Sequence, residues 1–454
     1  MAAAAVATAI ALAWAPARAG AAETGINVAI NQTVDGPAQA RHLRVGWARL
    51  FVGWSSAEPQ RGRYDQFYLA NLRRQVSGFR ARGIKVLLVV SGTPAWAAGR
   101  FGFGLAGPRD PGDYGRFAGE LVRLVPGIGA IEVWNEADEG TFWAGAPDPA
   151  GYAALLRAAY GAIKAQNRNV TVVTTGMVGN NYGFLSDVYA AGGGGAFDAV
   201  GVHTDTACLI TSPALYYREA GGRIGRFSFT GYREVHHVMA AHGDASKGIW
   251  MTEIGWNTGS QAPNSCRDGA VAGTRAEGVS ERTQAGFLRL AYRCLAADRY
   301  VRVALWFSLQ DVGHGAGYGD HLGLIRTNGR PKPAYTAMRN LRNGRAARPA
   351  RCGGPADHVG PSIAVRTPRD GAAIKQGKAM PVRVRARDNR GGTGVRRIDL
   401  LVDGQRVRTW LGGRIADYYW GFRGLGLGPH RVVFRARDFA TNVTERALTV
   451  RKVR

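Results

Sequence analysis

Short apolar runs alternate with longer amphipathic stretches over most of this chain, and few folds accommodate that alternation. The clearest run is IKVLLVVSG at 84–92, which is apolar without interruption, as in a strand buried on both faces. The helical stretch at 68–83 precedes it and ends at a glycine. Parallel strands need a crossover between them, so alternating strands and helices predict a parallel sheet.

The same pattern recurs along the chain. Further strands are expected at 42–54, 131–136, 170–176, 197–205, 248–256 and 301–311, and further helices at 114–125, 152–167 and 283–297. About eight βα units in roughly 320 residues predict an α/β fold, a closed (β/α)8 TIM barrel. A doubly wound open sheet is the alternative, but it normally has a phosphate-binding loop after its first strand, and the sequence has none.

The pattern changes near residue 345. Segment 346–360 is rich in Gly, Pro and Arg and is interpreted as a linker after a barrel domain at 24–345. Beyond it, stretches such as MPVRVRARD alternate with period two, and Asp403-Gly404 is a hairpin signal. Residues 361–454 are therefore expected to form a small all-β sandwich of the immunoglobulin-like kind, with arginine on its outward faces.

The N-terminal segment resembles an export signal. Residues 1–22 are apolar and Ala-rich, and Ala17-Arg18-Ala19 has the small-x-small form of a signal-peptidase site. We expect a signal peptide and a secreted or cell-surface protein; the alternative is an Ala-rich helix or tail. No later apolar run reaches the length of about 18 residues that spans a bilayer, so no transmembrane segment is expected in the mature chain.

Four cysteines are widely spaced, at Cys208, Cys266, Cys294 and Cys352. None belongs to a Cys-x-x-Cys pair, which weakens a zinc or redox interpretation. In an exported protein we expect one or two disulfides. Cys208 could meet Cys266 in neighbouring loops, and Cys294 could be joined to Cys352, tying the last helical layer to the interdomain segment. Four buried thiols are the alternative.

The net charge of +26 comes almost entirely from arginine. This charge is spread along the sequence, with no basic motif, so it does not predict specific nucleic-acid binding. Attraction to an anionic surface or polymer, such as an anionic glycan or a cell wall, is what the charge supports.

Polar residues end several of the expected strands, and in a parallel barrel these ends meet at one mouth. They are Arg49, Ser91, Asn135, Glu136, His203, Asp205, Glu253, Trp256, Trp306 and Asp311. Glu136 and Glu253 each follow an apolar strand and are expected to face each other across the mouth. Two opposed carboxylates are what glycosidic cleavage needs, because one protonates the leaving oxygen and the other attacks or activates water. Asp138 and Glu139 are interpreted as solvated loop residues.

Two motifs at these positions resemble those of clan A retaining glycoside hydrolases, similar to families 5 and 39. Trp134-Asn135-Glu136 matches the strand-4 motif, which implies that Glu136 is the acid/base and that Asn135 binds the sugar 2-hydroxyl. The TEIGW motif at 252–256 matches the strand-7 motif, which implies that Glu253 is the nucleophile.

The resemblance covers about residues 40–340 and implies further substrate-binding residues. Arg49 matches the arginine that keeps the nucleophile ionised, His203 the strand-6 histidine, and Trp306 the aromatic floor of the subsite. Trp256 is a candidate sugar-stacking platform, as are Trp96 and Trp143, with core packing as the alternative for each. The C-terminal region resembles the immunoglobulin-like modules appended to bacterial secreted enzymes.

These observations predict a secreted retaining glycosidase that acts on a β-linked glycan by double displacement, as a monomer without cofactor or metal. A non-catalytic glycan-binding or adhesion protein on the same barrel is the alternative. A nucleic-acid binder, favoured by charge alone, is the third.

Overall fold

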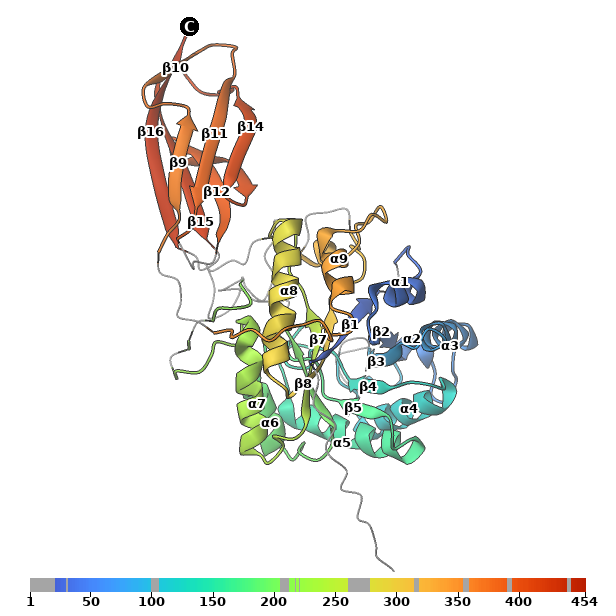
Figure 1. Ribbon diagram of the computed structural model, residues 1–454. Coiled ribbons are helices and arrows are strands. Elements are labelled where there is room, and N and C mark those ends of the chain that lie inside the picture. Colours follow the sequence, from blue (N-terminus) through green and yellow to red (C-terminus); the bar gives the residue numbers. More distant parts are fainter. Residues whose placement is uncertain are drawn as a thin grey trace, which may run out of the picture.

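The computed structural model describes residues 21–29, 32–98, 106–204, 212–216, 218–219, 221–259, 278–313, 318–353, 359–389, 394–438 and 442–454. Its first domain is the predicted closed barrel (Figure 1). Strands β1 to β8 are parallel neighbours in chain order, and β8 pairs back with β1. The open-sheet alternative is therefore wrong.

The barrel strands are β1 (Glu23–Val28), β2 (Trp47–Gly53), β3 (Lys85–Ser91), β4 (Ala130–Val133), β5 (Thr171–Val173), β6 (Ala199–His203), β7 (Gly248–Ile254) and β8 (Val301–Trp306). The helices are α1 (Gly36–Leu43), α2 (Trp54–Ala57), α3 (Gln66–Arg80), α4 (Pro111–Leu124), α5 (Pro149–Gln166), α6 (Tyr182–Ala190), α7 (Tyr232–Ala241), α8 (Glu281–Ala297) and α9 (Pro333–Asn340). Several begin at a side chain that accepts a hydrogen bond from the first turn, for example Asp65 before α3 and Ser280 before α8.

The first strand was not predicted. The sequence suggested one or two strands at 42–54, whereas α1 ends at Leu43 and β2 fills the rest of that stretch. Strand β1 instead begins at Glu23. Its apolar pattern is broken by Thr24 and Asn27, which are buried despite being polar, so periodicity alone does not reveal it.

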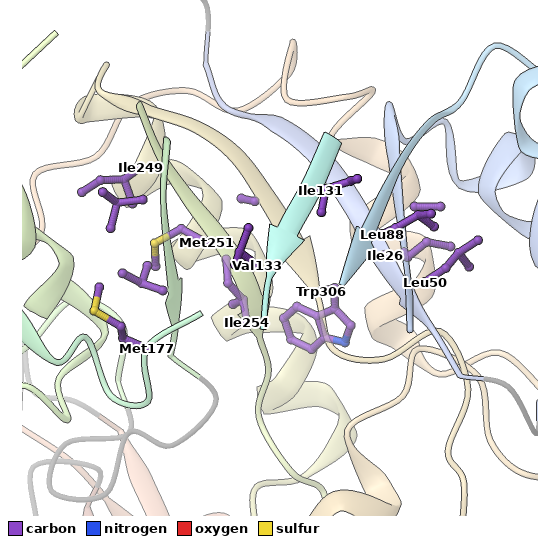
Figure 2. Close-up of a cluster of buried hydrophobic side chains, with 14 of the residues drawn as sticks. Ile26, Leu50, Leu88, Ile131, Val133, Met177, Ile249, Met251, Ile254 and Trp306 are labelled. Atoms are coloured by element: carbon purple, nitrogen blue, oxygen red, sulfur yellow. The ribbon is translucent and has the colours of Figure 1, made fainter. Parts of the chain in front are cut away.

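Alternate residues of the barrel strands pack into two separate cores. The outer core lies between the strands and the helices and includes Ile26, Leu50, Ile131 and Met251 (Figure 2). The inner core fills the barrel and consists of Trp47, Leu87, Ala130, Val173, Ala199, Trp250, Val303 and Leu305. The inner core closes the end of the barrel at which the strands begin. Nearer the carboxyl ends of the strands, polar residues such as Arg49 and Glu132 point into the barrel.

The second domain is the predicted β-sandwich. One sheet has the order β10-β16-β15-β12-β13 and the other β14-β11-β9. Their bounds are β9 (Ser362–Thr367), β10 (Ala372–Lys375), β11 (Met380–Arg387), β12 (Val395–Val402), β13 (Gln405–Leu411), β14 (Arg414–Trp420), β15 (Gly428–Asp438) and β16 (Val443–Val453). Buried residues of both sheets, among them Val384, Leu400 and Phe434, form its core.

The predicted Cys294–Cys352 disulfide is present and joins α8 to the segment that leaves the barrel. A side-chain hydrogen bond holds the same segment, since Arg233 Nη1 donates to Cys352 O at 2.9 Å. Cys208, Cys266, Asp205 and the predicted signal peptide up to residue 20 lie outside the described residues. Within the described residues, no helix has both the length and the apolar character needed to cross a membrane.

Candidate active site

The motif Trp134-Asn135-Glu136 forms a sharp turn and not the end of a strand. The expected strand at 131–136 stops at Val133, because Trp134 (φ 70°) and Glu136 (φ 50°) adopt left-handed backbone conformations. Each such residue costs about 1–3 kcal/mol and persists only where its surroundings hold it. Here Trp134 N donates to Val90 O at 3.1 Å, and the buried indole Nε1 donates to Phe142 O at 2.8 Å. The turn presents Asn135 and Glu136 at the barrel mouth.

A register shift brings Glu253 to the same place. The pairing of β7 slips next to His203 on one side and between Met251 and Ile254 on the other. Such irregularities re-aim side chains next to functional sites. As a result, successive residues of β7 both contact interior polar groups: Thr252 Oγ1 donates to Glu132 Oε1 at 3.2 Å, and Glu253 accepts from Arg49.

Arg49 contacts residues of both candidate catalytic motifs. Its fully buried guanidinium donates from Nη1 to Glu253 Oε1 at 2.5 Å and from Nη2 to Asn135 Oδ1 at 2.9 Å. It also donates to both oxygens of Glu132, from Nε at 2.7 Å and from Nη2 at 3.1 Å. One cation therefore fixes the strand-4 amide and the strand-7 carboxylate relative to each other.

Two members of this network were missed in the sequence. Glu132 is fully buried and accepts a further hydrogen bond from Gly176 N at 2.9 Å. Although burial alone would raise the pKa of Glu132, Arg49 and His203 lower it below its usual value. Asn27 of β1 accepts from Arg49 Nη1 at 2.9 Å and donates to Thr252 O. A charged residue inside an otherwise apolar strand was the available signal for Glu132.

His203 contacts both catalytic candidates. Its Nδ1 lies 2.7 Å from Glu136 Oε1, and its Nε2 lies 3.7 Å from Glu253 Oε1 and 3.8 Å from Glu132 Oε1. Burial alone would lower the pKa of His203, but these three carboxylates raise it well above its usual value. The imidazole therefore holds its ring proton more tightly than a free histidine, because it is surrounded by carboxylates.

The surroundings of Glu136 differ from those of Glu253, because Glu136 has no direct ion pair with Arg49. Its side chain is 14% exposed, and burial raises the pKa of Glu136 above its usual value, with Glu253 and Asp138 adding to the rise and His203 opposing it. A carboxyl group with a raised pKa is suited to proton donation. Glu253, by contrast, is held by a direct ion pair with Arg49.

Glu136, Glu253 and His203 converge on one point. A ligand atom from each lies within 4.8 Å of the others, which also makes them the one set of described residues that could hold a metal ion. The two carboxylates are thus as close as direct attack on a sugar requires, since retaining glycosidases separate theirs by about 5–5.5 Å.

The tryptophans are more buried than stacking platforms usually are. Trp306 is fully buried and Trp256 is 4% exposed; their rings lie 5.9 Å apart. Trp306 Nε1 donates to Leu322 O at 3.0 Å. Trp143 packs on Trp134 in the core, whereas Trp96 is half-buried.

Asp138 is not the solvated loop residue that was expected. It is 5% exposed and accepts hydrogen bonds from Val178 N at 3.1 Å and Asn181 Nδ2 at 2.9 Å. Burial raises the pKa of Asp138.

Asp311 pairs with Lys332 at 2.8 Å and has no contact with either catalytic candidate.

Comparison with solved structures supports the fold, whereas comparison by sequence finds no match. No family model matches the chain, and no curated protein matches it by sequence. A family 39 glycoside hydrolase from Bacteroides cellulosilyticus WH2 has a TM-score of 0.57 at 19% identity, over 89% of this chain and 80% of that chain. A GH5_18 enzyme from Streptomyces cattleya, solved with GlcNAc, has a TM-score of 0.52 at 16% identity, over 79% and 85%. Another structure from that organism, a GH5_18 variant with Manβ1-4GlcNAc bound, has a TM-score of 0.50 at 16% identity, over 78% and 85%.

The barrel has the fold of clan A glycoside hydrolases. The expected resemblance is therefore confirmed for the fold, and the C-terminal sheets fit the expected immunoglobulin-like sandwich.

Proposed function

We propose that this protein is a retaining glycoside hydrolase that cleaves a β-linked glycan by double displacement. The observation that carries the proposal is the approach of Glu136 and Glu253 within 4.8 Å at the mouth of a glycosidase-like barrel. That spacing is nearer to the about 5–5.5 Å of retaining glycosidases than to the about 6.5–9.5 Å of inverting ones, which favours retention over inversion.

The two carboxylates take different roles because their partners differ. Glu253, ion-paired with Arg49, is the nucleophile and forms a bond to the anomeric carbon as the glycosidic bond breaks. Glu136, whose pKa is raised, gives its proton to the departing oxygen. In the second step Glu136 removes a proton from water, which attacks the anomeric carbon and releases Glu253. In this proposal Asn135, whose Oδ1 accepts a hydrogen bond from Arg49, binds the sugar 2-hydroxyl.

Two observations support export. The N-terminal sequence ends in a small-x-small site, and the Cys294–Cys352 disulfide is of the kind that persists in oxidising compartments. For the substrate, the Manβ1-4GlcNAc bound by the Streptomyces cattleya structure makes β-mannosides the first sugars to try.

The test is intact-mass spectrometry after incubation with 2-deoxy-2-fluoro glycosides that carry activated leaving groups. The panel contains β-mannosides, β-glucosides and β-xylosides. We expect one sugar-mass adduct on Glu253, absent in Glu253→Gln, and the sugar that labels fastest identifies the substrate class. Glycan binding that survives both Glu136→Gln and Glu253→Gln, without labelling or hydrolysis of any sugar, would instead establish the non-catalytic alternative.

A further inference from the structure

Arginines cover the outer face of the three-stranded sheet in the sandwich. On β11, Arg383, Arg385 and Arg387 are exposed, and the residues that alternate with them lie in the sandwich core. The neighbouring strands add Arg366 of β9 and Arg414 of β14, which are also exposed. These five residues are called the arginine face below. The sequence spreads its positive charge along the chain, but the fold gathers this part of it on one surface.

The register sets the spacing of these charges. Residues two apart on a strand lie about 6.5–7 Å apart on the same face, so β11 carries a regular row of three arginines. Arg414 lies directly opposite Arg385 in the β11–β14 pairing. Like charges directly opposite each other destabilise a sheet, so the arginine face is unfavourable by itself and would be relieved by bound anions.

No described carboxylate forms an ion pair with any residue of the arginine face. The acids that flank these strands are engaged elsewhere: Asp370 accepts from Thr449 N at 2.7 Å, and Asp388 accepts from Gly394 N at 2.5 Å.

The other sheet differs in this respect. On its strands β12 and β13, Asp399 lies 3.2 Å from Arg397 and 4.0 Å from Arg406. On β15 and β16, Arg435 donates to Glu445 at 2.6 Å. Arginines on the five-stranded sheet are thus partly neutralised within the domain, whereas no carboxylate among the described side chains neutralises the arginine face.

We propose that the arginine face binds an acidic polysaccharide whose sugars carry carboxylates, a polyuronate. The choice of a glycan rests on the proposed function, because a face that binds an acidic polysaccharide would hold a glycosidase on material in which its own β-linked substrate is also present. Guanidinium groups pair well with carboxylates, and a polymer presents them repeatedly along a row. Tyr419, 63% exposed and opposite Pro381 beside the row, offers a ring on which a sugar can stack.

The test compares two matched triple variants of the full chain. Arg383→Gln/Arg385→Gln/Arg387→Gln removes three charges from the arginine face. Arg431→Gln/Arg446→Gln/Arg451→Gln removes three exposed charges from the other sheet. Binding to polygalacturonate and to a neutral mannan is measured by affinity electrophoresis at low salt, and unfolding curves confirm that both variants are folded. We expect polygalacturonate binding about tenfold weaker in the first variant only, since each exposed charge pair contributes modestly.

Three results would overturn the proposal. These are an equal loss in both triple variants, equal retention by polygalacturonate and mannan, and tighter binding to DNA than to polygalacturonate, which would indicate a nucleic-acid surface. Repeating the titration with Glu253→Gln separates this proposal from hydrolysis. Binding is read there without turnover, so a chain that binds polyuronate but never labels with fluoroglycosides refutes the catalytic proposal alone.

Discussion

His203 Nδ1 lies 2.7 Å from Glu136 Oε1, so a buried imidazole contacts the group proposed to donate the proton. The positive charge of His203 lowers the pKa of Glu136 and thereby limits the rise that burial causes. In the proposed mechanism Glu136 must be protonated for the first step, so this contact should set the upper end of the active pH range.

We therefore expect His203→Gln to move the alkaline limb of the kcat/KM profile to higher pH. Without the cation, Glu136 keeps its proton to higher pH, while the amide still fills the space of the ring. The measurement is kcat/KM against pH with an aryl glycoside. A control variant, His237→Gln, changes a mostly exposed histidine next to Glu234 on α7 and should leave the limb in place. An alkaline limb that moved to lower pH would contradict the electrostatic role.

Replacing Glu136 by Gln should lower kcat about 10²–10⁴-fold for a substrate with a poor leaving group, the usual contribution of a positioned acid. The loss should be much smaller for a dinitrophenyl glycoside, whose leaving group needs no proton. The matched control is Glu139→Gln, three positions along, which has no role in the proposed mechanism. If both substrates lost the same factor, Glu136 would be binding substrate and not donating a proton.

The Arg49–Glu132 pair should be essential for folding stability. Both side chains are fully buried, and breaking such a pair by removing one partner costs about 3–5 kcal/mol because a charge is left uncompensated. Arg49→Met should lower the free energy of unfolding by this amount in urea denaturation. Arg61→Met removes the Arg61–Asp113 ion pair, in which the Arg61 side chain is 65% exposed, and should cost less than about 1 kcal/mol. Similar losses in the free energy of unfolding for Arg49→Met and Arg61→Met would contradict the predicted difference between a buried and an exposed ion pair.

The sequence reveals the barrel more readily than the interior of the site. Continuous apolar runs such as 84–92 identify strands because both faces of a barrel stave are buried. Periodicity cannot show that Asn27 and Glu132 lie beside Arg49. Strand pairing places Asn27 of β1 opposite Arg49 of β2, and Glu132 lies on β4, which β3 separates from β2 in the barrel. Nor does it show that Trp134 leaves the strand, because left-handed backbone at a non-glycine residue depends on tertiary contacts.

Local patterns also show only part of the arginine face. Arg383, Arg385 and Arg387 are readable as one face of a strand, and the sequence did predict outward arginines there. The addition of Arg366 and Arg414 to that face depends on which strands become neighbours, which sequence periodicity does not specify.

The Cys294–Cys352 disulfide should stabilise the barrel by about 2–4 kcal/mol, because it closes a loop with a sequence separation of 58 residues in the unfolded chain. Cys294→Ala/Cys352→Ala should lower the urea midpoint of the tryptophan-fluorescence transition. The fluoroglycoside labelling rate should stay unchanged, because no contact joins this disulfide to the catalytic carboxylates. A midpoint equal to that of the wild type would show that the native contacts around Cys352 already hold the segment.

Zinc should inhibit the proposed hydrolysis, although the proposed mechanism uses no metal. Glu136, His203 and Glu253 offer three ligand atoms within 4.8 Å of one another, and zinc accepts this combination of imidazole and carboxylate ligands. Binding there would occupy the proton donor and the nucleophile together, so inhibition should be competitive with substrate and reversed by EDTA. His203→Gln should weaken the inhibition, whereas His237→Gln should not. The proposed mechanism also requires EDTA-treated protein to keep its full rate, and a lasting loss of activity after metal removal would show that a metal takes part.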